Sequence, residues 1–385
     1  MSEWKEYKLG ELGTVITGKT PSSRNPEDWG EEMLFITPSD YRNFGKHASN
    51  SERKLSSVGI ERLKNKVLPP KSILVTCIGS DMGKVVMNDV HCITNQQINA
   101  IIPHVNVDND FMYYLLVSIY DTLRIYGGDG TAVPIVNKKD FENIKVELPI
   151  SIDDQRRIAS ILTSLDDKID LLRCENATLE AMAETLFRQW FVVEAKEEWE
   201  EKPLSSIATF LNGLACQKYP PKNGIDKLPV LKIRELSSGI GSDSDWATTE
   251  VGEEYIVHAG DVIFAWSASL MVKIWEGEDC ILNQHLFKVT SDKYPKWFCY
   301  FWCKHHLNEF ISIAQSHATT MGHIKRGDLD TAMVLVPSDE ELLSMTEKME
   351  GLLKKMENNN EQINTLVQIR DGLLPRLMSN EIKLL

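Results

Sequence analysis

The segment IGSDMGK at residues 78–84 combines two glycines and a lysine, residue types that can bind a phosphate group. A Walker A loop needs four residues between its glycines and a Ser or Thr directly after its lysine. Here three residues separate Gly79 from Gly83, and Val85 follows Lys84. This spacing argues against ATP binding. It leaves two interpretations, a turn that carries one basic side chain towards DNA, or a plain turn.

Cys299, Cys303, His305 and His306 are a second candidate for chemistry, as metal ligands. Two cysteines four positions apart with adjacent histidines fit no standard zinc spacing. On a helix the two cysteines share a face with aromatic residues, so we expect core packing and no metal. The chain also lacks a methyltransferase Asn-Pro-Pro-Tyr/Phe motif and a nuclease cluster of carboxylates with lysine. We therefore expect no catalytic residues and a chain that is not an enzyme.

Side chains that can read DNA base edges are gathered in several turns. Arg and Lys hydrogen-bond to guanine, Asn and Gln to adenine, and Ser and Thr to either base. The candidates in the N-terminal half are Lys19, Thr20, Arg24, Thr37, Ser39, Asp40, Tyr41, Arg42, Ser80, Lys84, Asn95, Gln96, Gln97, Thr131, Lys138 and Lys139. Those in the C-terminal half are Lys232, Arg234, Ser267, Ser269, Asn283, Gln284, His285, Thr319, Thr320, Lys325 and Arg326. The alternative is that Asn, Gln and Ser only cap backbone groups in turns, so we expect part of this set to touch DNA.

The overall composition limits where the chain works and how it meets DNA. The 385 residues contain 42% hydrophobic and 25% charged residues, which is typical of globular domains. Seven irregularly spaced cysteines and the absence of a long apolar run favour a cytoplasmic protein. The net charge of −14 is unusual for a DNA-binding protein. Residues 1–152 hold 17 Lys and Arg against 19 Asp and Glu, so DNA contact would need local basic patches or a more basic partner.

Two long segments must position these turns, and both have the pattern of a coiled-coil helix. Apolar residues recur at alternating steps of three and four in 158–190 and again in 342–377, which is the spacing of a helix packed along another helix. The predicted seam consists of Leu162, Leu165, Ile169, Leu172, Asn176, Leu179, Leu186, Met349, Leu352, Met356, Ile363, Leu366 and Leu373. Asn176 and Asn359 either fix the register of the pair or face solvent. Trp190, Phe191, Leu374 and Leu377 are candidates for docking partner subunits, with core burial as the alternative.

The two segments end two halves that repeat each other. WKEYKLGELGTVITG at 4–18 aligns with WEEKPLSSIATFLNG at 199–213, LPPKSILVTC at 68–77 with VHAGDVIFAW at 257–266, and residues 130–149 with 318–337. We predict a mixed α/β fold with a pseudo-two-fold internal repeat. Its segments are a first domain at 1–152, a central spacer helix at 153–193, a second domain at 194–338 and a C-terminal helix and tail at 339–385.

The spacer helices would set the distance between the domains. The spacing alone allows parallel or antiparallel pairing, and we expect antiparallel pairing because it relates the halves by a pseudo-dyad. A helix of about 34 residues is roughly 50 Å long at about 1.5 Å per residue. That length exceeds one turn of B-DNA, about 34–36 Å. Such a pair predicts a protein that reads two short DNA sites with an unread gap between them.

Three stretches make the chain resemble the specificity subunits of type I restriction–modification enzymes. They are WKEYKLGELGTVITGKTP at the start, LDDKIDLLRCENATLEAMAETLFRQWF in the centre and LVQIRDGLLPRLMSNEIKLL at the end. The family's tail commonly has Gly where this chain has Asn380. The resemblance covers the whole chain and includes the two-fold repeat.

The resemblance implies that each half is a target recognition domain and that the chain performs no chemistry. It also implies that the helices dock two adenine-methyltransferase subunits, and that two translocase/endonuclease subunits complete the assembly. S-adenosylmethionine, ATP and Mg²⁺ would then belong to those partners, with no cofactor in this chain. The target would be an asymmetric, gapped sequence in double-stranded DNA.

Two other functions agree less well with the sequence. A coiled-coil scaffold that joins two proteins without touching DNA fits the acidic charge but not the turn composition. A self-sufficient methyltransferase would need a cofactor motif, which this chain lacks.

Overall fold

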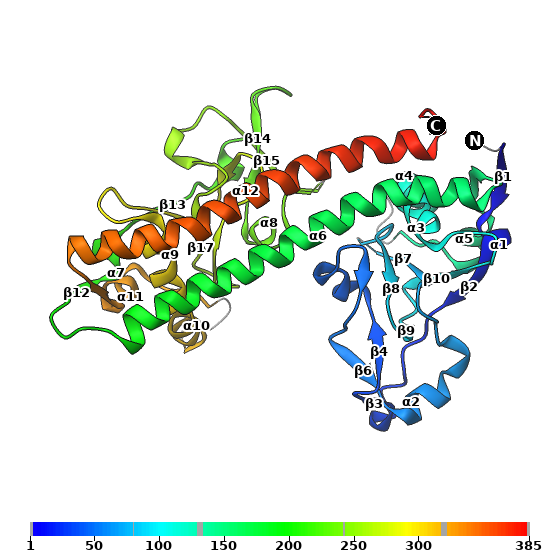
Figure 1. Ribbon diagram of the computed structural model, residues 1–385, viewed down its shortest axis with the longest axis horizontal. Helices are drawn as coiled ribbons and strands as arrows, with labels where there is room; N and C mark the ends of the chain where they lie inside the picture. The colour runs from blue at the N-terminus through cyan, green and yellow to red at the C-terminus, as the bar shows by residue number, and fades with distance from the viewer. Residues whose placement is uncertain (1–2, 80, 129–133, 242, 317–321, 383–385) are drawn as a thin grey trace. The chain divides into compact units, whose positions relative to one another are not determined.

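The computed structural model describes residues 3–79, 81–128, 134–241, 243–316 and 322–382 as a mixed α/β chain (Figure 1). It divides into two compact units, residues 1–173 with 362–385, and residues 174–361. Each unit therefore holds one globular domain and one part of the two long helices. In the described ranges, every helix is too short or too polar to cross a membrane.

The globular part of the first unit is built on three sheets. The main sheet has the strand order β2 (Gly13–Thr17), β10 (Ile98–Pro103), β7 (Ile73–Thr76), β8 (Val85–Asn88) and β5 (His47–Ala48). A second sheet has the order β3 (Trp29–Gly30), β6 (Arg53–Leu55), β4 (Met33–Ile36) and β9 (Cys92–Thr94), in which β4 and β9 are parallel. A third pairs β1 (Trp4–Lys8) with β11 (Lys145–Pro149).

The strand β7 shows why this sequence makes a central strand. All four of its residues are buried. Ile73 and Val75 face a core shared with helix α3 (Asn109–Ser118), whereas Leu74 faces a second core that contains Leu34 and Ile36 of β4. A strand covered on both faces needs a continuous apolar run, and ILVT supplies one. The remaining helices are α1 (Leu9–Leu12), α2 (Ser57–Arg62), α4 (Tyr120–Tyr126) and α5 (Lys138–Asn143).

The globular part of the second unit repeats this plan. Its main sheet has the order β13 (Thr209–Asn212), β20 (Leu286–Thr290), β17 (Val262–Ala265) and β18 (Met271–Ile274). Its second sheet has the order β15 (Trp246–Thr248), β14 (Lys227–Leu231), β19 (Cys280–Leu282) and β16 (Ile256–Val257). A third pairs β12 (Glu200–Pro203) with β21 (Met333–Val336). The helices are α7 (Leu204–Ile207), α8 (Ile233–Ser238), α9 (Lys296–His305), α10 (Leu307–Ser316) and α11 (Arg326–Thr331).

The cysteines expected in the core of the second unit lie there. Cys299 and Cys303 are on α9, where every residue from 297 to 303 is buried. Burial raises the pKa of the Cys299 thiol to about 12, so the thiol stays protonated. No group of His, Cys, Asp and Glu suited to a metal ion occurs among the described residues.

The structure confirms the internal repeat at the aligned segments. The predicted alignment of 68–77 with 257–266 places β7 on β17, residue for residue. Two residues before each of these strands the backbone is left-handed, with φ of 66° at Lys71 and 92° at Gly260. The alignment of 130–149 with 318–337 likewise places α5 on α11 and β11 on β21.

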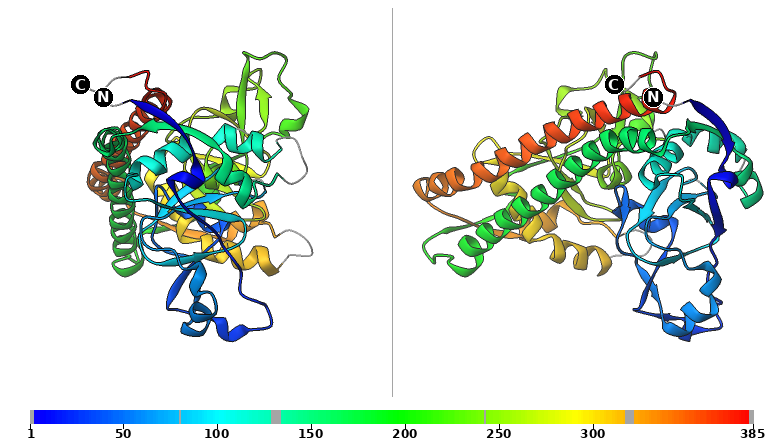
Figure 2. Two further views of the ribbon diagram at one scale, coloured as in Figure 1. Left: turned by 90° about the vertical axis from the view of Figure 1, so that its right-hand side faces the viewer. Right: turned by 45° about the vertical axis from the view of Figure 1, so that its right-hand side comes forward.

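The two long helices are α6 (Ile152–Arg188) and α12 (Asp339–Met378), of 37 and 40 residues. A π-helical turn at Gln189–Val193 ends α6. In both units the helices run antiparallel, as Figure 2 shows by their colours. In the first unit Asp166 pairs with Arg370, and in the second Asn176 contacts Asn359. The predicted seam residues are all buried or half-buried.

Asn176 and Asn359 hold the register of the helix pair in the second unit. The side-chain nitrogen of Asn359 donates to the Asn176 Oδ1 at 2.9 Å, and Asn176 Nδ2 donates to Asn360 Oδ1 at 2.6 Å. Asn359 is fully buried. Amides that pair only in one register disfavour sliding of one helix along the other. The alternative of solvent exposure does not describe Asn359.

Candidate nucleic-acid interface

In the first domain, three segments that hold predicted DNA-reading residues surround one open groove of about 270 Å³. The segments are residues 37–42, 78–84 and 95–97. The groove is lined by Thr37, Pro38, Ser39, Arg42, Ile78, Gly79, Asp81 and Gln97. These residues come from the ends of β4, β7 and the turn before β10. The chain order separates them by up to 60 positions, so only the sheets bring them together.

Backbone hydrogen bonds hold these segments at the same end of the sheets. The Asn95 amide donates to the Ile36 carbonyl at 3.2 Å, and the Cys77 amide donates to the Gln97 carbonyl at 2.7 Å. The Lys19 amide donates to the Thr94 carbonyl at 2.8 Å, so the turn at residues 18–21 lies at the same end of the sheets. Gly18 permits this approach, because a Cβ there would lie 2.2 Å from the Asn95 carbonyl oxygen.

The basic candidates of the first domain fall into two groups. Lys19, Arg24, Arg42 and Lys139 are exposed and form no ion pair with any described residue. Lys84 pairs with Asp81 at 2.6 Å, and Lys138 pairs with Glu142 at 3.5 Å. The first group can meet a phosphate or a guanine without giving up an existing partner.

Several polar candidates of the first domain are engaged within the protein. Thr20 donates to Gln96 Oε1 at 2.7 Å, and Asn95 donates to Gln97 Oε1 at 2.9 Å. Asp40 is 3% exposed and Tyr41 is 6% exposed. Burial raises the pKa of Tyr41 well above its ordinary value. For Asp40 and Tyr41 the turn-capping and packing alternative fits the structure better than contact with a base. Ser39, Arg42 and Gln96 remain exposed.

The corresponding face of the second domain has the same framework. The Asn283 amide donates to the Leu231 carbonyl at 3.2 Å, and the Gln284 amide donates to the Leu214 carbonyl at 2.8 Å. Gly213 plays the part of Gly18, since a Cβ there would lie 2.3 Å from the Asn283 carbonyl oxygen. Asn283 and Ser267 are nearly buried, whereas His285, Ser269, Lys325 and Arg326 are exposed and Gln284 is half-buried.

Sequence reasoning missed one residue on this face, Trp266. Its ring stacks on Phe287 with a centroid distance of 5.7 Å, and the rings of His285 and His323 lie beside it. Its indole Nε1 donates to Asn212 Oδ1 at 3.1 Å. The available signal in the sequence was a tryptophan directly after the apolar run Val262–Ala265. An indole in this position can stack on a base or contact a thymine methyl group.

The basic candidates Lys232 and Arg234 of the second domain are both in ion pairs. Lys232 pairs with Asp245, and Arg234 pairs with Glu235 and with Asp243, each at 2.6 Å. The hydrogen bond from Lys232 lowers the pKa of Asp245. Four further candidates, Ser80, Thr131, Thr319 and Thr320, lie outside the described residues. Direct contact with DNA stays a prediction for every residue named here.

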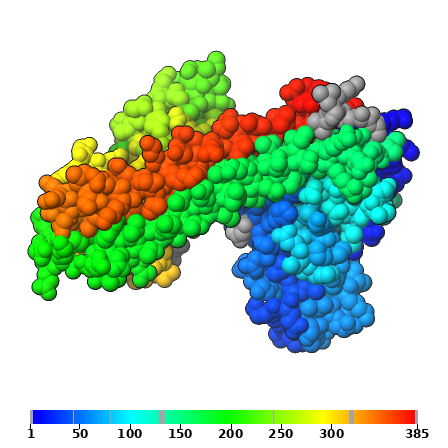
Figure 3. Space-filling view, viewed as in Figure 1, coloured from blue at the N-terminus to red at the C-terminus, as the bar shows by residue number. Residues whose placement is uncertain are grey.

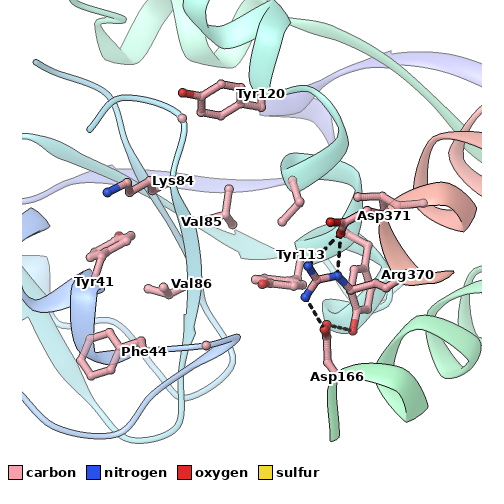
Figure 4. Close-up of a pocket in the computed structure, with 15 residues that line it drawn as sticks. Tyr41, Phe44, Lys84, Val85, Val86, Tyr113, Tyr120, Asp166, Arg370 and Asp371 are labelled. Atoms are coloured by element: carbon pink, nitrogen blue, oxygen red, sulfur yellow. Dashed lines mark hydrogen bonds and ion pairs between the residues drawn. The ribbon is translucent and has the colours of Figure 1, made fainter. Parts of the chain in front are cut away.

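In the first unit, the helix pair meets the recognition domain around a second cavity, of about 370 Å³. Figure 4 shows Arg370 between Asp166 and Asp371, with Tyr41, Phe44 and Val86 across the cavity. Arg370 Nη1 lies 2.9 Å from Asp166 Oδ1, and the Tyr114 hydroxyl donates to the other oxygen at 2.6 Å. Burial disfavours the charge on Arg370, but its bonds to Asp166 and Asp371 raise its pKa above the ordinary value. This network anchors the helices to the domain.

The four predicted docking residues lie at the ends of the helices. Phe191 is buried against Phe187, Trp199 and Phe298, and Leu377 is buried in the core of the first unit. Trp190 and Leu374 are half-buried against the same cores. Core packing, the alternative raised for these residues, therefore describes Phe191 and Leu377, whose side chains are not available on the surface.

Comparison with known proteins covers both halves of the chain. Residues 1–181 and 196–368 each match the type I restriction modification DNA specificity domain. The MjaIX specificity subunit of Methanocaldococcus jannaschii, a type I restriction enzyme subunit, is 25% identical over 99% of this chain and 94% of its own length. The HindI specificity subunit of Haemophilus influenzae is 35% identical over 41% of this chain and 35% of its own length.

A solved structure supports the fold. The S subunit of a type I restriction–modification system from M. genitalium superposes with a TM-score of 0.54 at 14% identity, over 98% of this chain and 96% of that one. At this identity the likeness concerns the fold alone. Because the domain match covers most of the sequence, the chain belongs to the type I restriction modification DNA specificity family.

Proposed function

We propose that this chain is the DNA specificity subunit of a type I restriction–modification enzyme. Each recognition domain reads one half of a gapped, asymmetric duplex target, and the α6–α12 pair sets the gap. The observation that carries this proposal is the pair of reading faces. They share one framework, held by the Asn95 and Asn283 turns, but present different side chains. Two such faces suit two different half-sites.

The chain itself performs no catalysis in this proposal. S-adenosylmethionine, ATP and Mg²⁺ belong to partner subunits, which are two adenine methyltransferases and, in the restricting enzyme, two translocase/endonuclease subunits. The partners also supply phosphate contacts that a chain of net charge −14 cannot supply alone. The assembly works on cytoplasmic DNA.

The outer faces of the long helices support docking of the methyltransferase subunits. Figure 3 shows α6 and α12 running along the surface. Leu171 is 60% exposed and Ile369 is 44% exposed in the first unit, and Met182 is 50% exposed and Leu343 is 62% exposed in the second. Each unit thus offers an exposed apolar side chain on each helix, and we propose that one partner subunit covers them.

A map of adenine methylation in host DNA, with and without this gene, tests the proposal. We expect one gapped, two-part motif to lose its methylation on deletion and to regain it on complementation. Unchanged methylation in a host whose partner genes are expressed would contradict the proposal.

The acidic charge favours one other function, a scaffold that joins two proteins without touching DNA. In that case purification of the tagged chain would recover two partners, and its removal would leave every methylated motif intact.

A further inference from the structure

The segments that follow β4 and β14, here called the reading loops, each contain a buried carboxylate at the same position of the repeat. Ile36 and Leu231 are equivalent, because each ends a strand that is parallel to its neighbour and accepts the amide of Asn95 or Asn283. Asp40 follows Ile36 by four residues, and Glu235 follows Leu231 by four. Asp40 is 3% exposed and Glu235 is 0% exposed. A buried carboxylate is costly unless it is hydrogen-bonded, so each must have a structural or functional use.

In the first domain the carboxylate binds the backbone of the loop. Asp40 Oδ2 accepts hydrogen bonds from the amide and the hydroxyl of Thr37, both at 2.8 Å. Asp40 Oδ1 accepts from the Glu52 amide at 2.8 Å. These bonds fix the turn from which Ser39 and Arg42 project, and they leave the Arg42 guanidinium without an ion-pair partner among the described residues.

In the second domain the carboxylate binds an arginine instead. Glu235 Oε1 accepts from Arg234 Nε at 3.0 Å and Nη2 at 2.6 Å, and from the Ser244 hydroxyl at 3.1 Å. Asp243 holds the other side of the guanidinium, through Nη1 to Oδ2 at 2.6 Å and Nη2 to its carbonyl oxygen at 3.1 Å. Arg234 thereby joins the start of α8 to the segment around Asp243.

The number of free donors decides what Arg234 can do. A guanidinium has five N–H groups, and Arg234 uses four of them in these bonds. Reading a guanine through its O6 and N7 needs two donors on one edge. Releasing Glu235 would leave a buried charge unpaired, which is strongly unfavourable. The four bonds therefore disfavour release of Arg234 when DNA binds.

We propose that Asp40 and Glu235 are equivalent positioning residues that fix the reading loops of the two domains, and that Glu235 does so by holding Arg234, which reads no base. The inference rests on the proposed function. Base reading in the second domain then falls to other residues of its face, such as Trp266, Gln284 and His285.

The test uses the full-length chain assembled with its partner subunits and measures binding to duplexes altered in one half-site at a time. The variants are Glu235→Gln, Arg234→Gln, their combination and Asp40→Asn. Glu254→Gln, which changes an exposed glutamate of the same domain, is the matched control. The readout is the ratio of affinities for the intact and the altered duplex. A loss of folded protein alone would lower both affinities together and leave this ratio unchanged.

We expect Glu235→Gln, Arg234→Gln and the double variant each to reduce discrimination at the second half-site by about tenfold, with no further loss in the double. Asp40→Asn should do the same at the first half-site only. If a Glu235 variant fails to fold, Asp243→Asn releases Arg234 from the exposed side and should give a smaller loss at the second half-site.

Two results would overturn the inference. One is that Arg234→Gln relaxes a single base pair while Glu235→Gln keeps full discrimination. The other is that the losses of the two single variants multiply in the double. Failure of the proposed function is distinguishable, since the wild-type assembly would then prefer no gapped duplex at all.

Discussion

In the first recognition domain, Lys19, Arg24 and Arg42 reach the surface without an ion-pair partner among the described residues. In the second, Lys232 is paired with Asp245, and Arg234 with Glu235 and Asp243, so that only Lys325 and Arg326 among its basic candidates are exposed without an ion-pair partner in the described ranges. Four strands of the main sheets beneath these side chains correspond, β2, β10, β7 and β8 to β13, β20, β17 and β18. One framework therefore carries two faces of different electrostatic character.

This difference indicates how the two domains share the work of binding. A free cation gains a phosphate or base contact at little cost, whereas a paired cation must give up its partner first. We expect the first domain to contribute more of the salt-dependent affinity and the second to rely more on amide, imidazole and indole groups. The helix pair differs too: its ion pair in the first unit, between Asp166 and Arg370, is largely buried, whereas the second unit combines paired amides with the more exposed ion pair of Lys355 and Glu175.

The largest effect should come from breaking the ion pair of the helices in the first unit. Arg370→Met leaves Asp166, whose side chain is 10% exposed, without its cation. We expect a loss of about 3 kcal/mol in the free energy of unfolding. Chemical denaturation measures it. Lys355→Met, which removes an exposed partner of Glu175 in the second unit, is the control and should cost under about 1 kcal/mol. Equal losses would show that the two pairs do not differ as described.

The next effect tests whether the two frameworks are equivalent. Gly18→Ala and Gly213→Ala each place a Cβ within 2.3 Å of a carbonyl oxygen. Each should lower the free energy of unfolding by about 2 kcal/mol. Each should also weaken binding only to the half-site that its own domain reads. Gly224→Ala is the control, since nothing lies within 4 Å of its added Cβ. If only one of the two substitutions is destabilising, the close contact between the glycine and the carbonyl oxygen is not shared by both domains.

Removing one positive charge from each face should have a smaller effect on DNA binding, and this effect should differ between the two faces. Arg42→Gln should weaken DNA binding by about 1.5 kcal/mol and reduce the slope of log affinity against log salt by about one if Arg42 meets a phosphate. Lys232→Gln should change affinity less, because Lys232 is already paired with Asp245. Binding measured across a salt series decides between them. A larger slope change for Lys232→Gln would reverse the comparison.

The smallest effect is a pH dependence specific to the second unit. The hydrogen bond to Asp279 raises the pKa of His258 above its ordinary value of 6.5. The stabilisation is therefore complete below pH 6.5 and is lost as pH rises through the higher folded-state pKa. His258 is 44% exposed, so screening limits the effect to about 0.3 kcal/mol. The equivalent residue of the first domain is Pro69, which cannot contribute. His258→Gln should abolish this part of the stability–pH curve.

The repeat and the helix seams could be predicted from sequence because both depend on periodic apolar burial. The steps of three and four through Leu162, Ile169 and Leu172 leave little choice of buried face. Boundaries were less certain. The chain breaks at Ile119 between α3 and α4, and the central spacer helix, predicted to reach residue 193, ends at Arg188 in a π-helical turn. The division into four domain segments stays a prediction.

The reading faces were only partly predictable, because residue type does not reveal which partner a side chain takes. Arg42 and Arg234 look alike in sequence, yet one is free and the other is held by residues one and nine positions away. Asp40 reads as a possible base contact, but it caps its own turn. Trp266 was overlooked because its ring becomes part of the face only when β17 and β20 pair.

The most direct test of the two-face account is the methylated motif before and after exchange of residues 1–150 for the same domain of a relative. Sequencing that detects methylated adenine reads both half-sites and the gap at once. The account predicts that one half-site changes while the other half-site and the gap stay as they were. A change in both half-sites would contradict it, because the domains would not then read DNA independently.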